Sequence, residues 1–280
     1  MKLYRASPQD GIVWITGGSS GIGRALAKEL ASAGYTVAVT AREGDPIDML
    51  IAEAAALPGK IVSFPCDVGD ETRMADTFAA IEGRVGPIAL AVFNAGAYIP
   101  MAGENMSVRK FRRTFEVNVL GVVHGLVPTV RAMQQRGRGH ILLVGSISAW
   151  FGWPTTAAYG ASKAALNVMA QALKYDFDKI NIRIQIANPG FVDTPLLKQT
   201  APSLPAMIPA GEAARRLFKG INSGGFEIAF PRRLVWGLKL ASIMPQPVRH
   251  RLISTLTRWN SRPLSFGRKT PQKKAETADR

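Results

Sequence analysis

The stretch TGGSSGIG at residues 16–23 follows the apolar run 12–15 and leads into a helical pattern that begins at Gly23. Its glycines allow a tight turn and a close approach of the backbone to a pyrophosphate, whose negative charge is stabilised at a helix N-terminus. A glycine-rich turn can also be no more than a tight turn. Its place between the first strand and the first helix favours the phosphate-binding interpretation.

Short apolar runs and longer helical patterns alternate onward from this turn. The predicted strands are 12–15, 36–40, 61–64, 89–93, 140–144 and 182–187, with a last one at 226–230. The predicted helices are 23–33, 47–56, 72–82, 109–135, 157–178 and 210–223. Strict alternation predicts an α/β fold: a Rossmann-like, doubly wound parallel sheet in a single domain, at residues 1–230. The segment 195–209 carries four prolines and is expected to be a loop or a short helical lid over the site.

The net charge of +15 is concentrated at the C-terminal end of the chain. Residues 231–280 hold 12 Lys or Arg against two acids, a balance of +10, so the other 230 residues carry only +5. This distribution speaks against a nucleic-acid reader, whose basic residues would cover a binding face. We divide this end into a basic amphipathic extension at 231–260 and a basic tail at 261–280, which we expect to be disordered.

Cysteine usage and hydropathy indicate the compartment. The single cysteine, Cys66, cannot form an internal disulfide, and nothing therefore calls for an oxidising environment. We see no signal peptide, and no run reaches the ~20 apolar residues of a membrane-spanning helix. We expect a cytoplasmic protein, either free or peripheral to a membrane.

The end of the second predicted strand distinguishes between two dinucleotides. NAD-selective folds carry an acidic residue here, which binds the ribose hydroxyls. This chain has Ala41 followed by Arg42, and a guanidinium can pair with a 2′-phosphate. We therefore predict NADP(H) as the cofactor, with NAD(H) less favoured. The alternative is that Arg42 is only a solvated surface residue.

Tyr159 and Lys163 stand one turn apart near the start of a predicted helix, so their side chains share a face. A phenol with a pKa near ~10 is a poor acid–base catalyst at neutral pH, but a neighbouring ammonium stabilises the phenolate and lowers that pKa. Ser146 lies at the carboxyl end of a predicted strand, where its hydroxyl can hold a substrate oxygen; Ser148 is a nearby competitor. The three residues predict proton transfer at a substrate oxygen.

Asn118 lies in an apolar stretch of the helical pattern 109–135. An amide in apolar surroundings needs hydrogen-bond partners. We expect a kink or an ordered water at this point.

Taken together, the motifs resemble the short-chain dehydrogenase/reductase family. They occur in the family's order and at its usual intervals: the turn at 16–23, Cys66-Asp67-Val68, Asn94-Ala95-Gly96, Asn118, Ser146, Tyr159-x3-Lys163, and Asn188-Pro189-Gly190 with Thr194. The resemblance covers residues 11–230. It implies an enzyme that interconverts a carbonyl and a secondary alcohol by hydride transfer with NADP(H), as a homodimer or homotetramer. A non-enzymatic NADP-binding regulator on the same fold is the alternative. It would be marked by loss of a catalytic residue, and none is lost.

The resemblance also implies roles for individual residues. Asn118, Ser146, Tyr159 and Lys163 match the catalytic tetrad, in which Asn118 orders a water that relays protons to Lys163. No metal is implied. The implied cofactor contacts are Gly17, Ser19, Ser20, Gly21, Ile22 and Gly23 in the turn, Arg42, Asp67 and Val68 on the adenosine side, Asn94, Ala95 and Gly96 on the ribose side, Tyr159 and Lys163, and Pro189, Gly190, Val192 and Thr194 on the nicotinamide side.

The chain departs from the family pattern at two positions. Phe93 stands where a second Asn is common. Ser20 stands where some NADP-linked members carry a basic residue. The second departure leaves Arg42 as the main contact expected for the 2′-phosphate.

The substrate side of the predicted site is apolar. Trp150, Phe151 and Trp153 lie between Ser146 and Tyr159, and they either line a pocket or belong to the core or to a subunit contact. We expect a bulky hydrophobic carbonyl or alcohol, such as a lipid, a terpenoid, or a steroid-like or aromatic ketone. The extension at 231–260 mixes basic and apolar residues, so it meets either a membrane surface or protein, namely a subunit or the substrate pocket.

Overall fold

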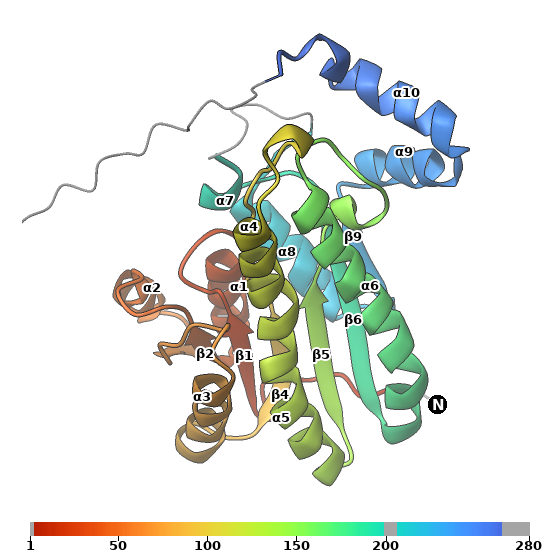
Figure 1. Cartoon of the computed structure of the whole chain (residues 1–280). Helices are drawn as coiled ribbons and strands as arrows, with labels where there is room; N and C mark the ends of the chain where they lie inside the picture. Colours follow the sequence, from red (N-terminus) through yellow and green to blue (C-terminus); the bar gives the residue numbers. More distant parts are fainter. Residues whose placement is uncertain (1–2, 199–205, 265–280) are drawn as a thin grey trace, which may run out of the picture.

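The computed structural model describes residues 3–198 and 206–264. Seven parallel strands form one sheet in the order β3-β2-β1-β4-β5-β6-β9 (Figure 1). Their apolar side chains are buried because helices cover both faces, as the predicted fold requires. The strand order reverses between β1 and β4, which places the ligand-binding crevice there, beyond the carboxyl ends of the strands. The strands are β1 (Ile12–Thr16), β2 (Thr36–Thr40), β3 (Lys60–Ser63), β4 (Ile88–Phe93), β5 (Gly139–Val144), β6 (Ile182–Pro189) and β9 (Glu227–Phe230).

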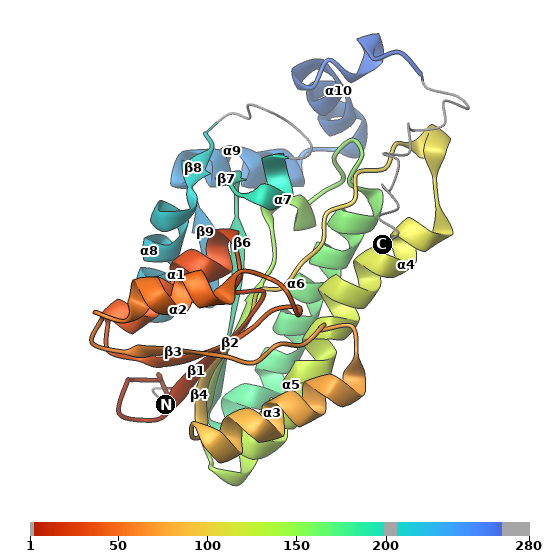
Figure 2. The same ribbon diagram turned by 90° about the vertical axis from the view of Figure 1, so that its left-hand side faces the viewer.

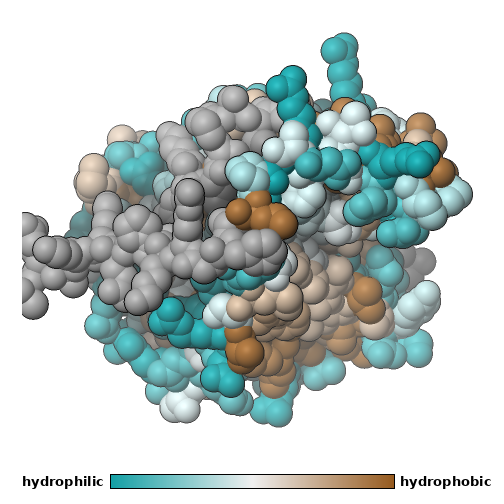
Figure 3. Space-filling view, turned by 45° about the horizontal axis from the view of Figure 1, so that its top comes forward, coloured by the Kyte–Doolittle hydropathy of each residue, from teal (hydrophilic) through white to brown (hydrophobic). Residues whose placement is uncertain are grey.

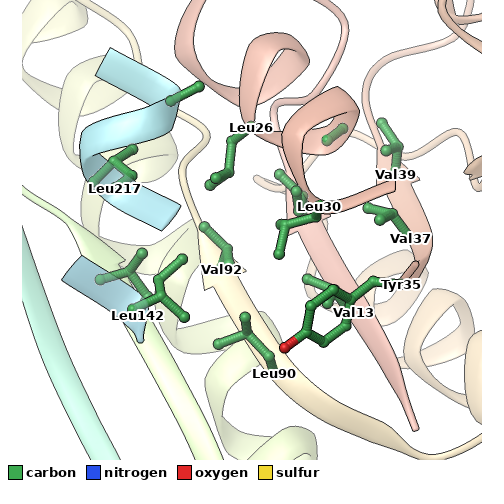
Figure 4. Close-up of a cluster of buried hydrophobic side chains, with 14 of the residues drawn as sticks. Val13, Leu26, Leu30, Tyr35, Val37, Val39, Leu90, Val92, Leu142 and Leu217 are labelled. Atoms are coloured by element: carbon green, nitrogen blue, oxygen red, sulfur yellow. The ribbon is translucent and has the colours of Figure 1, made fainter. Parts of the chain in front are cut away.

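Two layers of helices enclose the sheet, one on each face (Figure 2). The first layer packs its leucines onto valines and leucines of the central strands, among them Leu26, Leu30 and Leu217 (Figure 4). The second layer packs around Trp14 and Phe93. The first layer comprises α1 (Gly21–Ser32), α2 (Ile47–Ala54) and α8 (Ala210–Ile221), and the second comprises α3 (Glu71–Arg84), α5 (Gly121–Gln135) and α6 (Ala157–Phe177).

The sequence predictions for these elements are confirmed to within two residues at either end, with one exception. The single helix predicted over 109–135 is wrong. The chain there forms α4 (Val108–Phe115), a π-helical turn η2 (Glu116–Leu120) and then α5. The π-helical turn contains Asn118, so the backbone distortion expected at that amide is present.

The C-terminal extension is helical and lies at the carboxyl end of the sheet, at the top of Figure 1. It consists of α9 (Arg232–Ile243), α10 (Gln246–Leu256) and the 3-10 turn η5 (Trp259–Ser261). Among the described residues, no helix is long and apolar enough to cross a membrane. The disorder predicted for the tail falls largely outside the described residues, which end at Leu264.

The segment predicted as a loop or lid after β6 begins with a pairing and a short helix. β7 (Val192–Asp193) pairs with β8 (Ile208–Pro209), and α7 (Pro195–Lys198) follows β7. The part between α7 and residue 206 lies outside the described residues.

Candidate active site

The glycine turn forms a cradle that larger side chains would fill. Gly17 and Gly21 have φ angles of 69° and 54°, in the left-handed region that glycine favours. A Cβ atom on Gly17 would lie 2.7 Å from the Cα of Ala95, and one on Gly23 would lie 2.3 Å from the carbonyl oxygen of Gly17. Ser20 makes no cap hydrogen bond to α1, which leaves the first amides of that helix open to an anion. The cradle therefore fits the pyrophosphate of a dinucleotide.

Asn94, at the end of β4, holds this turn in place. Its Nδ2 donates hydrogen bonds to the carbonyl oxygens of Thr16 and Gly17 at 3.1 and 2.9 Å. The backbone N–H groups of Asn94 and Ala95 donate to the Thr16 hydroxyl at 3.1 and 3.2 Å. The side-chain amide of Asn94, which was expected to contact the ribose, thus donates both of its hydrogen bonds to the turn. These bonds join the end of β4 and the cradle into one hydrogen-bonded unit.

The segment after β6 borders the same cradle. A Cβ atom on Gly21 would lie 2.9 Å from Cγ2 of Thr194. The N–H of Gly190 donates to the carbonyl oxygen of Phe230 at 2.8 Å, and Val192 is buried in β7. The structure therefore brings residues 189–194 next to the glycine turn.

Asp67, after β3, lies on the adenosine side of the predicted site. Its carboxylate accepts hydrogen bonds from the Gly69 N–H and from Arg113 of α4, both at 2.9 Å. Burial raises the pKa of this carboxyl, but the Gly69 amide and Arg113 outweigh burial and hold the pKa below its usual value. Val68 packs against Gly121 in the core. Arg113 was missed by the sequence analysis because it lies 46 residues away and carries no motif.

An acidic residue, also missed, joins Ser19 of the glycine turn to Arg42, the residue predicted to contact the 2′-phosphate. The Ser19 hydroxyl donates to Oδ2 of Asp45 at 3.2 Å. The backbone N–H of Arg42 donates to the same oxygen at 3.2 Å, and the guanidinium of Arg42 lies 3.8 Å from Oδ1. The structure therefore places Ser19 and Arg42 around a common anion.

The two hydroxyls predicted to be catalytic lie near each other at the start of α6. The Ser146 hydroxyl lies close enough to the Tyr159 phenol to lower its pKa, and it accepts a hydrogen bond from the Ser148 N–H at 3.1 Å. The structure thus brings Ser146 to the phenol, as expected, and gives Ser148 a supporting backbone contact.

Burial dominates the pKa values of the predicted catalytic pair. It raises the pKa of Tyr159 to about 12, with the Ser146 hydrogen bond acting in the opposite direction. It lowers the pKa of Lys163 to about 8. The expectation that Lys163 lowers the phenol pKa is wrong for this geometry, since Nζ lies 5.8 Å from the ring centroid and donates to the Val144 carbonyl oxygen at 2.8 Å. Tyr159 is therefore a neutral phenol at neutral pH.

Tyr98, which the sequence analysis did not single out, lies against the catalytic phenol. Its ring centroid is 4.9 Å from that of Tyr159, and its hydroxyl is 3.3 Å from Oγ1 of Thr155. The N–H of Met101 donates to the Thr155 carbonyl oxygen at 3.0 Å. The loops after β4 and β5 therefore meet beside Tyr159. The only sequence signal for Tyr98 is its place just after the Asn94–Gly96 motif.

Asn118 is fully buried, and its amide is satisfied by protein groups. Its Oδ1 accepts from the Ala97 N–H at 2.7 Å, and its Nδ2 donates to the Ala97 carbonyl oxygen at 3.0 Å and to the Ser162 hydroxyl at 2.9 Å. A Cβ atom on Gly96 would lie 3.5 Å from both Asn118 Oδ1 and Lys163 Nζ. The structure thus brings Asn118 to Lys163, and the water relay stays a prediction.

The aromatic segment after Ser146 packs beneath the C-terminal extension. Phe151 is buried in a cluster with Leu238 of α9 and Ile253 of α10, and its ring stacks on Trp153 at 5.1 Å. Of the two interpretations left open for these aromatic residues, core packing is correct for Phe151. The extension therefore contacts the segment that joins Ser146 to Tyr159.

Comparisons with known proteins agree with this arrangement. Residues 11–204 match the family model described as short chain dehydrogenase. An uncharacterised oxidoreductase of Myxococcus xanthus is 30% identical over 234 residues, 84% of this chain and 92% of that protein. The 3-oxoacyl-(acyl-carrier-protein) reductase MabA of Mycobacterium tuberculosis is 31% identical over 186 residues, 66% of this chain and 71% of that protein.

Solved structures show the same fold. A short-chain dehydrogenase from Streptomyces avermitilis superposes with a TM-score of 0.74 at 25% identity, covering 89% of this chain and 97% of that one. A short-chain type dehydrogenase/reductase from Mycobacterium marinum gives 0.72 at 29% identity, covering 79% and 94%. The chain therefore belongs to the short-chain dehydrogenase/reductase family of oxidoreductases.

Proposed function

We propose that this protein is an NADP(H)-dependent oxidoreductase that interconverts a hydrophobic carbonyl compound and its secondary alcohol. The observation that carries the proposal is that Ser146 and the buried Lys163 both lie next to the phenol of Tyr159. The glycine turn, Asp67 and residues 189–194 would hold the cofactor, which supplies the hydride when bound.

The phenol of Tyr159 supplies the proton in the reductive direction. Its pKa of about 12 keeps it protonated at neutral pH, the form that a general acid needs when a carbonyl oxygen gains negative charge. Ser146 lies within hydrogen-bond reach of that phenol, so its hydroxyl can stabilise the same substrate oxygen. Lys163, with a pKa of about 8, is a cation at neutral pH, and its Nζ lies 5.8 Å from the centre of the phenol ring. We expect reduction to be the better served direction near pH 7.

The donors around Asp45 support NADP(H) over NAD(H). The Ser19 hydroxyl, the Arg42 N–H and the Arg42 guanidinium all converge on one carboxylate. Groups that gather around a carboxylate also suit the more highly charged 2′-phosphate. The residue directly after β2 is the buried Ala41, so no acid stands at the position that binds ribose hydroxyls in NAD-selective relatives of this fold.

A hydrophobic substrate is supported by the surroundings of Ser146. The segment from Ser146 to Tyr159 carries Trp150 and Trp153 as partly buried aromatic residues. The Mycobacterium tuberculosis relative is named for a 3-oxoacyl substrate, which is a ketone on an acyl chain. Such a ketone falls within the proposed class.

The outer face of the extension supports contact with an anionic membrane surface. Helices α9 and α10 each expose an apolar stripe at helical spacing, and residues 231–280 carry a charge of +10. A helix with an apolar stripe and basic neighbours binds at the interface of anionic lipids. The exposed stripes are Trp236, Leu240 and Ile243 on α9, and Val248, Leu252 and Leu256 on α10.

A second apolar face supports assembly into a homodimer or homotetramer. Figure 3 shows an apolar area on the side of the molecule where α5 and α6 lie. These two helices expose Val127 and Val168, respectively. Burial of such a face in a subunit contact is favourable. Light scattering should show a Val168→Asp variant at lower mass than the wild type, and an unchanged mass would contradict this assignment.

A Tyr159→Phe variant tests the proposed reaction. It removes the proton donor and keeps the ring, so turnover of hydrophobic ketones, followed by NADPH absorbance, should fall at least ~100-fold. NADPH binding, measured by calorimetry, should stay near the wild-type value. Tyr175→Phe is the matched control, since Tyr175 lies exposed on the same helix. Near-wild-type turnover by Tyr159→Phe would show that another group donates the proton.

A further inference from the structure

A chain of hydrogen bonds runs from the C-terminal extension to the backbone of the catalytic serine. Lys239 of α9 pairs with Oε2 of Glu227 in β9. The other oxygen of Glu227, Oε1, accepts a hydrogen bond from Nδ2 of Asn188 at 2.8 Å. Oδ1 of Asn188 accepts the backbone N–H of Ser146 at 3.0 Å. Three side chains thus connect α9 to Ser146.

Glu227 determines which way the amide of Asn188 faces. A carboxylate only accepts hydrogen bonds, so it must face the NH2 group of the amide, and the oxygen is left for the other side. Nδ2 of Asn188 also donates to Oδ1 of Asn167 at 2.8 Å, which uses its second proton. Oδ1 of Asn188 is therefore held towards the N–H of Ser146.

The same amide is connected to the helix that carries Lys163. Nδ2 of Asn167 donates to Oδ1 of Asn188 at 3.1 Å and to the carbonyl oxygen of Lys163 at 3.0 Å. A Cβ atom on Gly145 would lie 2.4 Å from Oδ1 of Asn188, so only glycine lets the amide approach the strand end this closely. Asn188 is completely buried, and a change in its orientation would alter the hydrogen bonds that lead to both Ser146 and Lys163.

The extension is packed in a way that fixes the outer end of this chain. Nζ of Lys239 lies 5.4 Å from the ring centroid of Trp150, and the guanidinium of Arg249 lies 5.5 Å from that of Phe151. At its far end, Arg262 pairs with Glu104 in the loop after β4. Helices α9 and α10 therefore contact the loop after β5, and Arg262, just beyond η5, contacts the loop after β4.

We propose that Glu227 and Lys239 are positioning residues for Ser146, so that the C-terminal extension helps to hold the active site in place. The proposal rests on the proposed function, in which Ser146 holds the substrate oxygen. Lys239 holds the Glu227 carboxylate, Glu227 orients the Asn188 amide, and Asn188 places the Ser146 backbone. Neither Glu227 nor Lys239 touches the reacting atoms.

A Lys239→Met variant of the full chain tests the proposal. Without its cation, the Glu227 carboxylate is freed from α9, and the Asn188 amide loses one of the contacts that fix its orientation. We expect kcat for ketone reduction to fall about tenfold, while the Kd for NADPH and the KM for the ketone change less than about twofold. Arg233→Met is the matched control, because Arg233 lies exposed on the same helix, and it should match the wild type. Lys239→Arg keeps the ion pair and should restore most of the loss.

Hydrogen exchange gives a readout that does not depend on turnover. In Lys239→Met, the amide protons of residues 145–148 should exchange at least about fivefold faster than in Arg233→Met. If the wild-type protein had no ketone reductase activity, the proposed function would be wrong. The hydrogen-exchange comparison of Lys239→Met with Arg233→Met would still test the positioning role. Equal exchange and equal kcat in the two methionine variants would overturn the positioning role.

Glu227→Gln provides a second variant of nearly the same shape. An amide can present either a donor or an acceptor to Asn188, so it no longer dictates the orientation. We expect the same loss of kcat and the same faster exchange around Ser146 as in Lys239→Met. Wild-type values for both measurements, in a variant that melts like the wild type, would also overturn the proposal.

Discussion

The hydroxyl of Ser19 donates a hydrogen bond of 3.2 Å to the carboxylate of Asp45. Because Arg42 donates to the same oxygen, Asp45 occupies the donors that we propose for the 2′-phosphate of NADP(H). A carboxylate there repels the phosphate and must move away before the phosphate can bind.

Replacing Asp45 by Asn should therefore strengthen binding of the phosphorylated cofactor. We expect the Kd for NADPH to fall about tenfold, equivalent to about 1.4 kcal/mol, and the Kd for NADH to stay unchanged. Calorimetry with 2′,5′-ADP and 5′-AMP isolates the 2′-phosphate, and Asp48→Asn serves as the control because Asp48 is exposed in the first turn of α2. If Asp45→Asn instead weakened NADH binding, Asp45 would be a ribose ligand and NAD(H) the better cofactor.

Adding one methyl group at Gly23 should destroy the cofactor cradle. The new Cβ would lie 2.3 Å from the Gly17 carbonyl oxygen and 2.4 Å from Nδ2 of Asn94, so the turn must open. We expect Gly23→Ala to weaken NADPH binding at least tenfold and to lower the free energy of unfolding by about 2 kcal/mol.

Gly83→Ala is the matched control for this change. Gly83 lies inside α3, and a Cβ there meets nothing within 4 Å. Alanine should stabilise that helix by up to ~1 kcal/mol and leave binding unchanged. Fluorescence titration with NADPH and urea denaturation measure both effects; undisturbed binding in Gly23→Ala would show that the turn is not the cofactor cradle.

Local patterns predicted most of the fold. Hydrophobic runs and the glycine turn are signals within a few residues, and the strands and most helices follow them closely. The long pattern 109–135 was misjudged because its apolar spacing continues through the π-helical turn, where only the buried Asn118 signals the irregularity.

Tertiary effects could not be predicted in the same way. Asp67–Arg113 and Asn188–Glu227 join residues that are 46 and 39 positions apart, so no spacing rule brings them together. The pKa of Tyr159 was expected to fall because Lys163 is close in sequence. Burial raises it instead, and the extent of burial depends on the loops that meet beside the phenol.

The apolar stripe on α9 yields a prediction about membrane binding. Trp236 and Leu240 lie one turn apart, and both are exposed. A double Trp236→Ser, Leu240→Ser variant should lose most of its co-sedimentation with vesicles rich in phosphatidylglycerol, since the apolar contact drives insertion at the interface. Met49→Ser removes an exposed apolar residue from α2, away from the extension, and should bind like the wild type. Equal sedimentation of all three proteins would contradict a membrane role for α9.

The buried ammonium of Lys163 should make stability depend on pH. Its side chain is 3% exposed, and burial lowers its pKa from 10.5 to about 8. Between those two pH values the unfolded chain binds more protons than the folded one, so the free energy of unfolding rises with pH across this window. Below about pH 8 the buried cation destabilises the fold by about 3 kcal/mol, and above about pH 10.5 that penalty is gone.

Lys163→Met should therefore be more stable than the wild type at pH 7, although it will be inactive. The methionine removes the buried charge and loses the hydrogen bond to the Val144 carbonyl oxygen, worth about 1 kcal/mol, so we expect a net gain of about 2 kcal/mol. At pH 10.5 the gain should vanish, because the lysine is then neutral in the folded wild type. Lys219→Met, at an exposed position of α8, should show neither effect. Urea denaturation of the three proteins at both pH values measures these free energies of unfolding. A Lys163→Met variant that is less stable than the wild type at pH 7 would show that the surroundings stabilise the ammonium.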